Sequence, residues 1–127
     1  MRSLAFRRMA FTTLIAGAPA LAMADAWQCD FTAECALATG CTDASFSARL
    51  IAADHAGELF LTTAMGDSPV IRLTPLSTLP ASYAGAGQIG TAELLTIEVD
   101  RTAILSVHHF DGTAVALTYF GTCAELN

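Results

Sequence analysis

Apolar and polar residues alternate with a period of two through much of the chain after residue 26. The alternation is clear in residues 45–50 and resumes in residues 58–64, with the turn-forming sequence Asp54-His55-Ala56-Gly57 between them. Successive side chains of a β-strand point to opposite faces, so this period predicts strands with one buried face. Two such runs joined by a short turn predict a β-hairpin.

The last third of the chain carries the clearest strand signal. Residues 94–99, 103–110 and 113–122 read as strands, and Asp100-Arg101 and Asp111-Gly112 lie between them as turns. Asp-Gly between two alternating runs is a strong signal for a tight hairpin loop. We therefore expect a three-stranded antiparallel meander in this part of the chain.

Two further short strands complete the predicted sheet. Residues 27–31 form one, and residues 70–74 form a run that Pro75 ends, after a break at residues 65–69. Isolated hairpins are marginally stable in water, so all these strands must share one core. The sequence predicts an all-β, single-domain antiparallel sheet curled into an open or closed small barrel, which leaves few strand edges exposed.

Residues 76–90 interrupt the alternation with Pro80 and three glycines. Structureless segments of this length are uncommon in small domains, so this one is a mobile lid, a binding loop or an irregular strand that the pattern hides. If it binds a ligand, Tyr83 and Gln88 are the side chains that we expect to contact it. The string Gly85-Ala86-Gly87-Gln88-Ile89-Gly90 matches the G-x-G-x-x-G pattern of nucleotide-binding loops, but it lacks the strand before and the helix after that phosphate binding needs.

The first 24 residues have the features of a secretory signal peptide. Three arginines in the first eight residues precede an apolar run over residues 9–22, and the sequences Ala22-Met23-Ala24 and Ala24-Asp25-Ala26 both fit the small-x-small pattern of a cleavage site. The run is shorter than the ~20 apolar residues of a membrane span, and a glycine and a proline interrupt it. We predict a signal peptide over residues 1–24 and one mature β domain over residues 25–127, with no membrane insertion after cleavage.

Removal of this leader makes the protein strongly acidic. Three of the six basic residues leave with it, and the remaining three arginines face twelve Asp and Glu residues, which gives a net charge of −9 with His neutral. The chain contains no lysine. Nucleic acids and anionic lipid surfaces are bound chiefly through Lys and Arg, so we expect neither as a partner.

All four cysteines lie in the predicted mature domain. An even number of cysteines in an exported chain indicates disulfides, and three pairings are possible. We favour Cys29–Cys123, which joins the first strand-like segment to the last, and Cys35–Cys41, which closes a small loop. A zinc site or a redox pair would be expected to have the C-x-x-C spacing, which is absent. The leader and the disulfides together predict a periplasmic or secreted location.

The histidines are the other candidates for chemistry. His108 and His109 are adjacent, so on a strand their side chains point to opposite faces and do not bind one metal ion together. We expect one of them inside the sheet near Tyr119, and we take His108 and Tyr119 as candidate ligand-binding residues. Ser106 lies two residues before His108, which leaves a small hydrolase or a metal-binding protein using His108 as an alternative function, without a nucleophile-elbow sequence to support it. We assign no catalytic residue and expect no metal and no cofactor.

Several short stretches resemble a group of small, uncharacterised exported proteins of Gram-negative bacteria. They are Trp27-Gln28-Cys29, Cys35, Cys41, Ser106-Val107-His108 and the terminal Thr118-Tyr119-Phe120-Gly121-Thr122-Cys123. The likeness spans most of the predicted mature chain and implies export and cysteine use, but no activity. The expected size, disulfides and barrel are also similar to those of the periplasmic inhibitors of c-type lysozyme, in architecture only, since no Ser-Gly-x-x-Tyr-like inhibitory loop is found here.

These observations favour a periplasmic binding or interaction module that recognises a periplasmic protein or a small ligand through its loops. The chain has the features of an exported, acidic β-scaffold with a long irregular segment at residues 76–90, and its sequence contains no catalytic motif. A structural protein of the envelope and a lysozyme-inhibitor-like protein are further alternatives.

Overall fold

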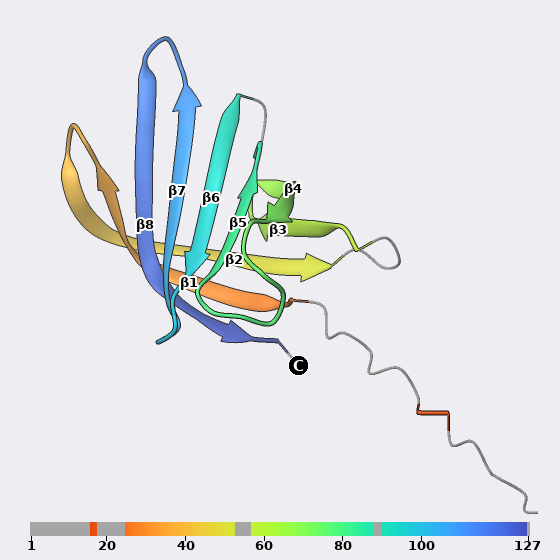
Figure 1. Cartoon of the computed structure of the whole chain (residues 1–127). Coiled ribbons are helices and arrows are strands. Elements are labelled where there is room, and N and C mark those ends of the chain that lie inside the picture. The colour runs from red at the N-terminus through yellow and green to blue at the C-terminus, as the bar shows by residue number, and fades with distance from the viewer. Residues whose placement is uncertain (1–15, 18–24, 53–56, 88–89, 127) are drawn as a thin grey trace, which may run out of the picture.

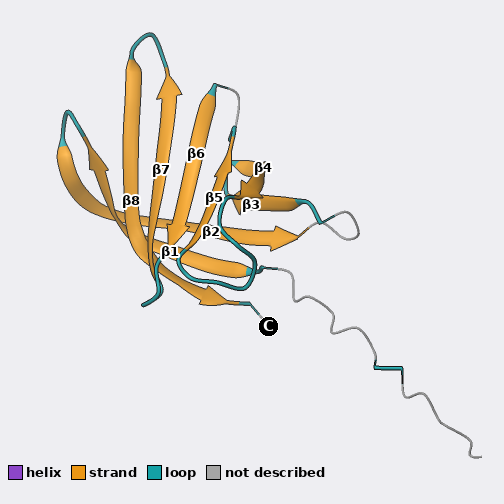
Figure 2. Cartoon of the chain, in the orientation of Figure 1, coloured by secondary structure: helices purple, strands orange, loops and turns teal. Residues whose placement is uncertain are grey.

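Most of the residues that the structure describes lie in strands of one β-sheet. A computed structural model describes residues 16–17, 25–52, 57–87 and 90–126, so the predicted signal peptide lies outside the described residues except for residues 16–17. The described residues contain no helix, as Figure 2 shows. The eight strands are β1 (Trp27–Ala36), β2 (Gly40–Ala52), β3 (Leu59–Thr63), β4 (Gly66–Arg72), β5 (Ala81–Gly85), β6 (Thr91–Ile97), β7 (Thr102–Phe110) and β8 (Ala114–Glu125).

Each strand pairs antiparallel with the next, and β1 also pairs antiparallel with β8, so the sheet closes into a barrel (Figure 1). The predicted fold class is therefore confirmed, and of the two predicted forms the barrel is the closed one. Closure removes the free strand edges that an open sheet would expose. The expected meander of the last third is also confirmed as β6, β7 and β8.

An even number of up-and-down strands places the start of β1 and the end of β8 at the same end of the barrel. We call this the terminal end; it contains Asp25, Leu126 and the β4–β5 loop of residues 73–80. The opposite end, which we call the mouth end, carries the tips of the β1–β2 hairpin at residues 37–39 and of the β7–β8 hairpin at residues 111–113. In Figure 1 the β7–β8 hairpin rises highest, with the β1–β2 hairpin beside it at the left.

The core fills the half of the barrel nearest the terminal end. Alternate residues of every strand point inward there and are almost fully buried. A bulge between Phe31 and Ala33 shifts the register of β1 against both neighbours and lets the strand bend. The largest fully buried side chains are Tyr83, Phe31, Leu50, Leu61, Leu95, Ile97, Leu105 and Cys29.

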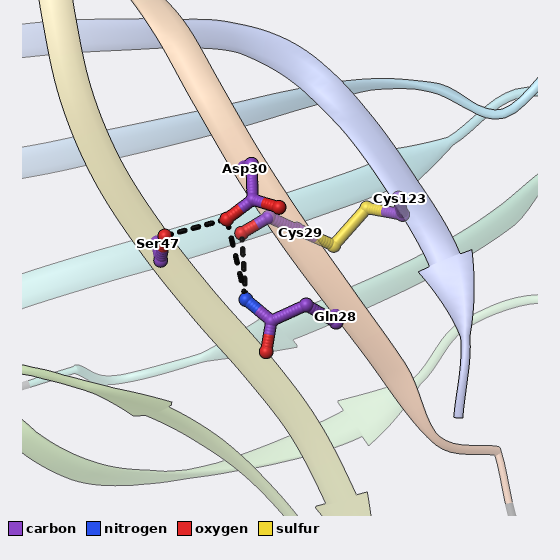
Figure 3. The surroundings of a disulfide bond; sticks show 5 residues. All are labelled: Gln28, Cys29, Asp30, Ser47 and Cys123. Carbon is purple, nitrogen blue, oxygen red and sulfur yellow. Dashed lines mark hydrogen bonds between the residues drawn. A yellow bond between two sulfur atoms is a disulfide. The ribbon is translucent and has the colours of Figure 1, made fainter. Parts of the chain in front are cut away.

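Two disulfides have the pairing that the sequence favours. Cys29 on β1 and Cys123 on β8 are linked inside the core, directly opposite each other in the strand register. Figure 3 shows this bond joining β1 to β8, while the neighbouring Asp30 carboxylate accepts a 2.6 Å hydrogen bond from the Ser47 hydroxyl on β2. Cys35 and Cys41 are linked across the β1–β2 hairpin at the mouth end.

Two segments differ from the sequence prediction. Residues 76–90 contain the strand β5, so of the three interpretations of this segment the hidden strand is correct. Its pattern was hidden because small residues fill it: a Cβ atom on Gly85 would lie 2.4 Å from the Pro69 carbonyl oxygen, so only glycine fits there. The predicted break at residues 65–69 is too long, because the turn covers residues 64–65 and β4 begins at Gly66. Pro69 is tolerated since pairing with β5 begins only at Val70.

Candidate functional site

The terminal end is held together by the side chain of Arg72, at the end of β4. Its guanidinium forms an ion pair with Asp25 and donates a 2.7 Å hydrogen bond to the Tyr83 hydroxyl. It also donates to carbonyl oxygens of the β4–β5 loop at 2.7–3.1 Å, those of Thr74, Pro75 and Thr78. The Arg72 side chain is only 6% exposed, so its charge depends on these partners for compensation.

Tyr83 is part of this closed end. The residue is 1% exposed and points into the core from β5, so the structure does not place it on a surface loop that could contact a ligand. Burial of the phenol and the nearby Asp25 carboxylate raise the pKa of Tyr83 to about 12. Its hydroxyl is engaged by Arg72, and we therefore do not retain Tyr83 as a binding residue.

Trp27 and Arg101 cover the barrel beside this network. The Arg101 guanidinium carbon lies 4.9 Å from the centroid of the Trp27 ring and the guanidinium forms a 3.1 Å ion pair with Glu125. Arg101 has a positive φ of 74° in the tight turn between β6 and β7, and its carbonyl oxygen accepts a 2.9 Å hydrogen bond from the Cys123 amide. This turn is the Asp100-Arg101 turn that the sequence predicts.

A cavity of about 430 Å³ lies at the terminal end. Its charged lining residues are already paired within the protein: Asp25 with Arg72, and Glu125 with Arg101, which lies outside the lining. A ligand could bind to these charged groups only by displacing their present partners. The remaining lining residues are Ala26, Trp27, Ser77, Thr78, Leu79, Val99 and Leu126.

The mouth end is open by comparison. Along β7 and β8 the inward-facing positions Ala103, Leu105 and Cys123 are buried, whereas the inward-facing positions closer to the mouth are only partly buried. These partly buried residues are Val107, His109, Val115, Leu117 and Tyr119. The barrel is therefore packed at one end and accessible at the other.

A cavity of about 700 Å³ lies at the mouth end, between the tips of the β1–β2 and β7–β8 hairpins, and its lining includes inward-facing (His109, Val115) and outward-facing (His108, Ala116) residues of the rim. Its walls are mostly apolar, and the only polar side chains among them are His108, His109 and Thr113. The apolar residues are Ala36, Leu37, Ala38, Ala114, Val115 and Ala116. Leu37 is fully exposed at the tip of its hairpin. Concave, mainly apolar sites with few polar groups are typical of small-molecule binding, and the mouth of a β-barrel is a common place for them.

Aromatic rings separate this mouth from the core. The Tyr119 ring stacks on Phe46 at 4.9 Å between centroids, and Phe31 packs against both rings at 5.8 and 6.2 Å. Burial and the neighbouring Glu34 carboxylate raise the pKa of Tyr119 to about 12. Tyr119 thus faces inward opposite Leu105 in the β7–β8 register, while the inward-facing His109 is opposite Val115, nearer the mouth.

Two carboxylates also face the inside of the barrel near the mouth. Glu34 is opposite Tyr119 in the β1–β8 register, and Glu93 is in phase with the buried Leu95 on β6. One Glu93 oxygen is buried and accepts no hydrogen bond within the described residues. Burial raises the pKa of Glu93, and a hydrogen bond involving Ser68 opposes this effect. These acids favour a ligand group that donates hydrogen bonds or carries positive charge.

The two adjacent histidines lie on opposite faces of β7, as expected. His108 is exposed, while His109 is partly buried on the same face as Leu105. The described residues contain no group of three or more side chains that could hold a metal ion. Gln88 lies outside the described residues. Arg72, Glu34 and Glu93 are not among the predicted site residues, although Glu93 continues the alternation of Leu95 and Ile97 along β6.

No family model, curated protein or solved structure matches this chain. The resemblance to exported proteins of Gram-negative bacteria therefore stays a prediction, and so does the architectural likeness to lysozyme inhibitors. Within the described ranges there is no helix long and apolar enough to cross a membrane. The two disulfides are compatible with an oxidising compartment outside the cytoplasm.

Proposed function

We propose that this protein is an exported, periplasmic binding protein that takes a small, mostly apolar ligand into the mouth of its barrel. The observation that carries the proposal is the cavity of about 700 Å³ between the β1–β2 and β7–β8 hairpin tips. It is larger than the cavity at the terminal end, and its walls carry no paired charges. A volume of this size suits one small organic molecule.

The inward-facing carboxylates refine the ligand class. Glu34 and Glu93 lie nearer the core than the cavity walls, and two of the three arginines of the predicted mature domain, Arg72 and Arg101, lie at the other end of the barrel. A ligand with an apolar body and a hydrogen-bond-donating or cationic group would match this arrangement. The predicted leader, the acidic charge and the disulfides support a periplasmic site of action.

A fluorescence titration with the neutral apolar dye N-phenyl-1-naphthylamine tests this proposal. We expect a saturable increase in dye fluorescence with the wild-type protein. Ala36→Phe should weaken dye binding at least about tenfold, because Ala36 lines the cavity and a larger side chain would fill it. Ser45→Phe is the matched control, since Ser45 is exposed on the outer face of the neighbouring strand β2. No dye binding, or equal binding by both variants, contradicts the proposal.

A further inference from the structure

The closed terminal end depends on the residues that come directly after the predicted leader. The sequence offers two cleavage patterns, Ala22-Met23-Ala24 and Ala24-Asp25-Ala26, which differ by two residues. Cleavage after the first leaves Asp25 at the start of the mature chain, and cleavage after the second removes it. The two products therefore differ in whether they keep the partner of Arg72.

Asp25 supplies the acidic partner of a buried cation. The Arg72 side chain is 6% exposed, and Asp25 is the one carboxylate that pairs with it among the described residues. The other partners of Arg72 are neutral carbonyl oxygens and the Tyr83 hydroxyl. Loss of Asp25 would leave a buried guanidinium with no counter-charge, which is strongly unfavourable.

The backbone at Ala26 also makes cleavage after this residue unfavourable for the folded protein. The Ala26 carbonyl oxygen accepts a 2.9 Å hydrogen bond from the Leu126 amide and so joins the two ends of the described chain. Cleavage after Ala26 would remove this acceptor and would create a positively charged amino group on Trp27. Trp27 is only 4% exposed, so that charge would have to be buried or the tryptophan would have to leave the core.

We infer that the leader is removed between Ala24 and Asp25, so that the mature protein begins with Asp25, and that Asp25 is required to close the terminal end of the barrel. The inference rests on the export proposed above. Signal peptidase cleaves the chain before it folds. Of the two possible products, the one that begins with Asp25 keeps the ion pair between Asp25 and Arg72. The new amino group on Asp25 would line the terminal-end cavity together with the Glu125 carboxylate.

Mass spectrometry and N-terminal sequencing of the full chain, expressed in a Gram-negative host, test the cleavage site. We expect the periplasmic fraction to contain a protein that begins with Asp25. Ala26→Leu disturbs only the second pattern and should leave this start unchanged, whereas Ala22→Leu disturbs only the first and should reduce the product that begins with Asp25. A wild-type start at Trp27 overturns the inference and leaves export intact. An unprocessed cytoplasmic chain overturns the export proposal as well.

A stability comparison tests the role of Asp25 independently. Two mature forms, one beginning with Asp25 and one with Trp27, are exported behind the same unrelated leader. We expect the shorter form to melt at least about 10 °C lower, because it buries an uncompensated charge. Arg72→Met, introduced into both forms, should reduce this difference, since the charge is then absent. Equal melting temperatures for the two unsubstituted forms overturn the claim that Asp25 closes the barrel.

Discussion

Cys29 and Cys123 are bonded across the seam where the first strand of the barrel meets the last, at a sequence separation of 94. In the chain-entropy model this cross-link stabilises the fold by restricting the unfolded chain, and a longer loop gives a larger effect. The second disulfide, Cys35–Cys41, spans only six residues within one hairpin. The two bonds should therefore contribute unequally to stability.

Replacing Cys29 and Cys123 together by Ala should lower the free energy of unfolding by about 4 to 5 kcal/mol, and replacing Cys35 and Cys41 should lower it by about 2 kcal/mol. Guanidinium chloride denaturation of the two double variants measures both values. The second variant is the control for the general effect of removing a disulfide. A larger loss for the Cys35 and Cys41 pair would contradict the proposed role of the seam.

The two disulfides should also differ in their rate of reduction. Cys29 has no exposed surface and Cys123 is 4% exposed, whereas Cys41 is exposed at the mouth end. A small thiol reductant reaches a sulfur atom only if that atom is accessible. With dithiothreitol under native conditions, followed by alkylation and peptide mapping, we expect label on Cys35 and Cys41 before any on Cys29 and Cys123. Simultaneous labelling of all four would show that the core opens first.

Both tyrosines of the chain should resist ionisation in the folded protein. Burial, together with Asp25 for Tyr83 and Glu34 for Tyr119, raises both pKa values from 10.0 to about 12. The unfolded chain loses its phenolic protons near pH 10, so stability should fall as the pH rises from about 10 to about 12. Absorbance at 295 nm should show little tyrosinate at pH 10.5 in native protein and extensive tyrosinate in denaturant. Equal titration in both conditions would contradict the burial of these side chains.

Glu93→Gln should stabilise the protein at neutral pH by about 1 kcal/mol or less, because it removes a partly buried charge. Burial raises the pKa of Glu93 above 4.5, so the folded protein holds this proton more tightly than the unfolded chain does. The wild-type protein therefore loses stability as the pH rises from about 4.5 through the raised pKa of the folded state. The gain should therefore be absent at pH 4 and present at pH 7.

Urea denaturation at the two pH values measures the effect of Glu93→Gln. Glu58→Gln is the matched control, since Glu58 is exposed beside β3. We expect that variant to change the free energy of unfolding by less than about 0.5 kcal/mol, as surface substitutions usually do. If Glu93→Gln destabilises the protein at pH 7, the carboxylate has a compensating partner in solution.

The alternation of side chains was enough to predict most strands and the fold class. It did not reveal β5, because Ala81, Ala84 and Gly85 give little contrast between the two faces of that strand. It also could not reveal the Arg72–Asp25 pair, since these residues are 47 positions apart and meet only after the barrel closes. Glu93 was missed for another reason. The alternation pattern identifies inward-facing positions by their apolar side chains, and Glu93 is a charged residue on the inward face.

The candidate site was the least predictable part of the molecule. The sequence placed binding in residues 76–90, whereas the cavity of about 700 Å³ lies between the β1–β2 and β7–β8 hairpins. Pairing of β1 with β8 brings these hairpins together, and that pairing joins the two most distant strands in the sequence. The local pattern of apolar and polar residues does not indicate which distant strands pair with each other.

The most direct test of a binding mouth is a two-dimensional ¹H–¹⁵N NMR titration of the mature protein with N-phenyl-1-naphthylamine. We predict saturable shifts in the backbone signals of Ala36, His109, Val115 and Ala116, which line the cavity, and unchanged signals for Ala26 and Arg72 at the terminal end. Shifts confined to the terminal end, or no saturable shifts at all, would contradict the account.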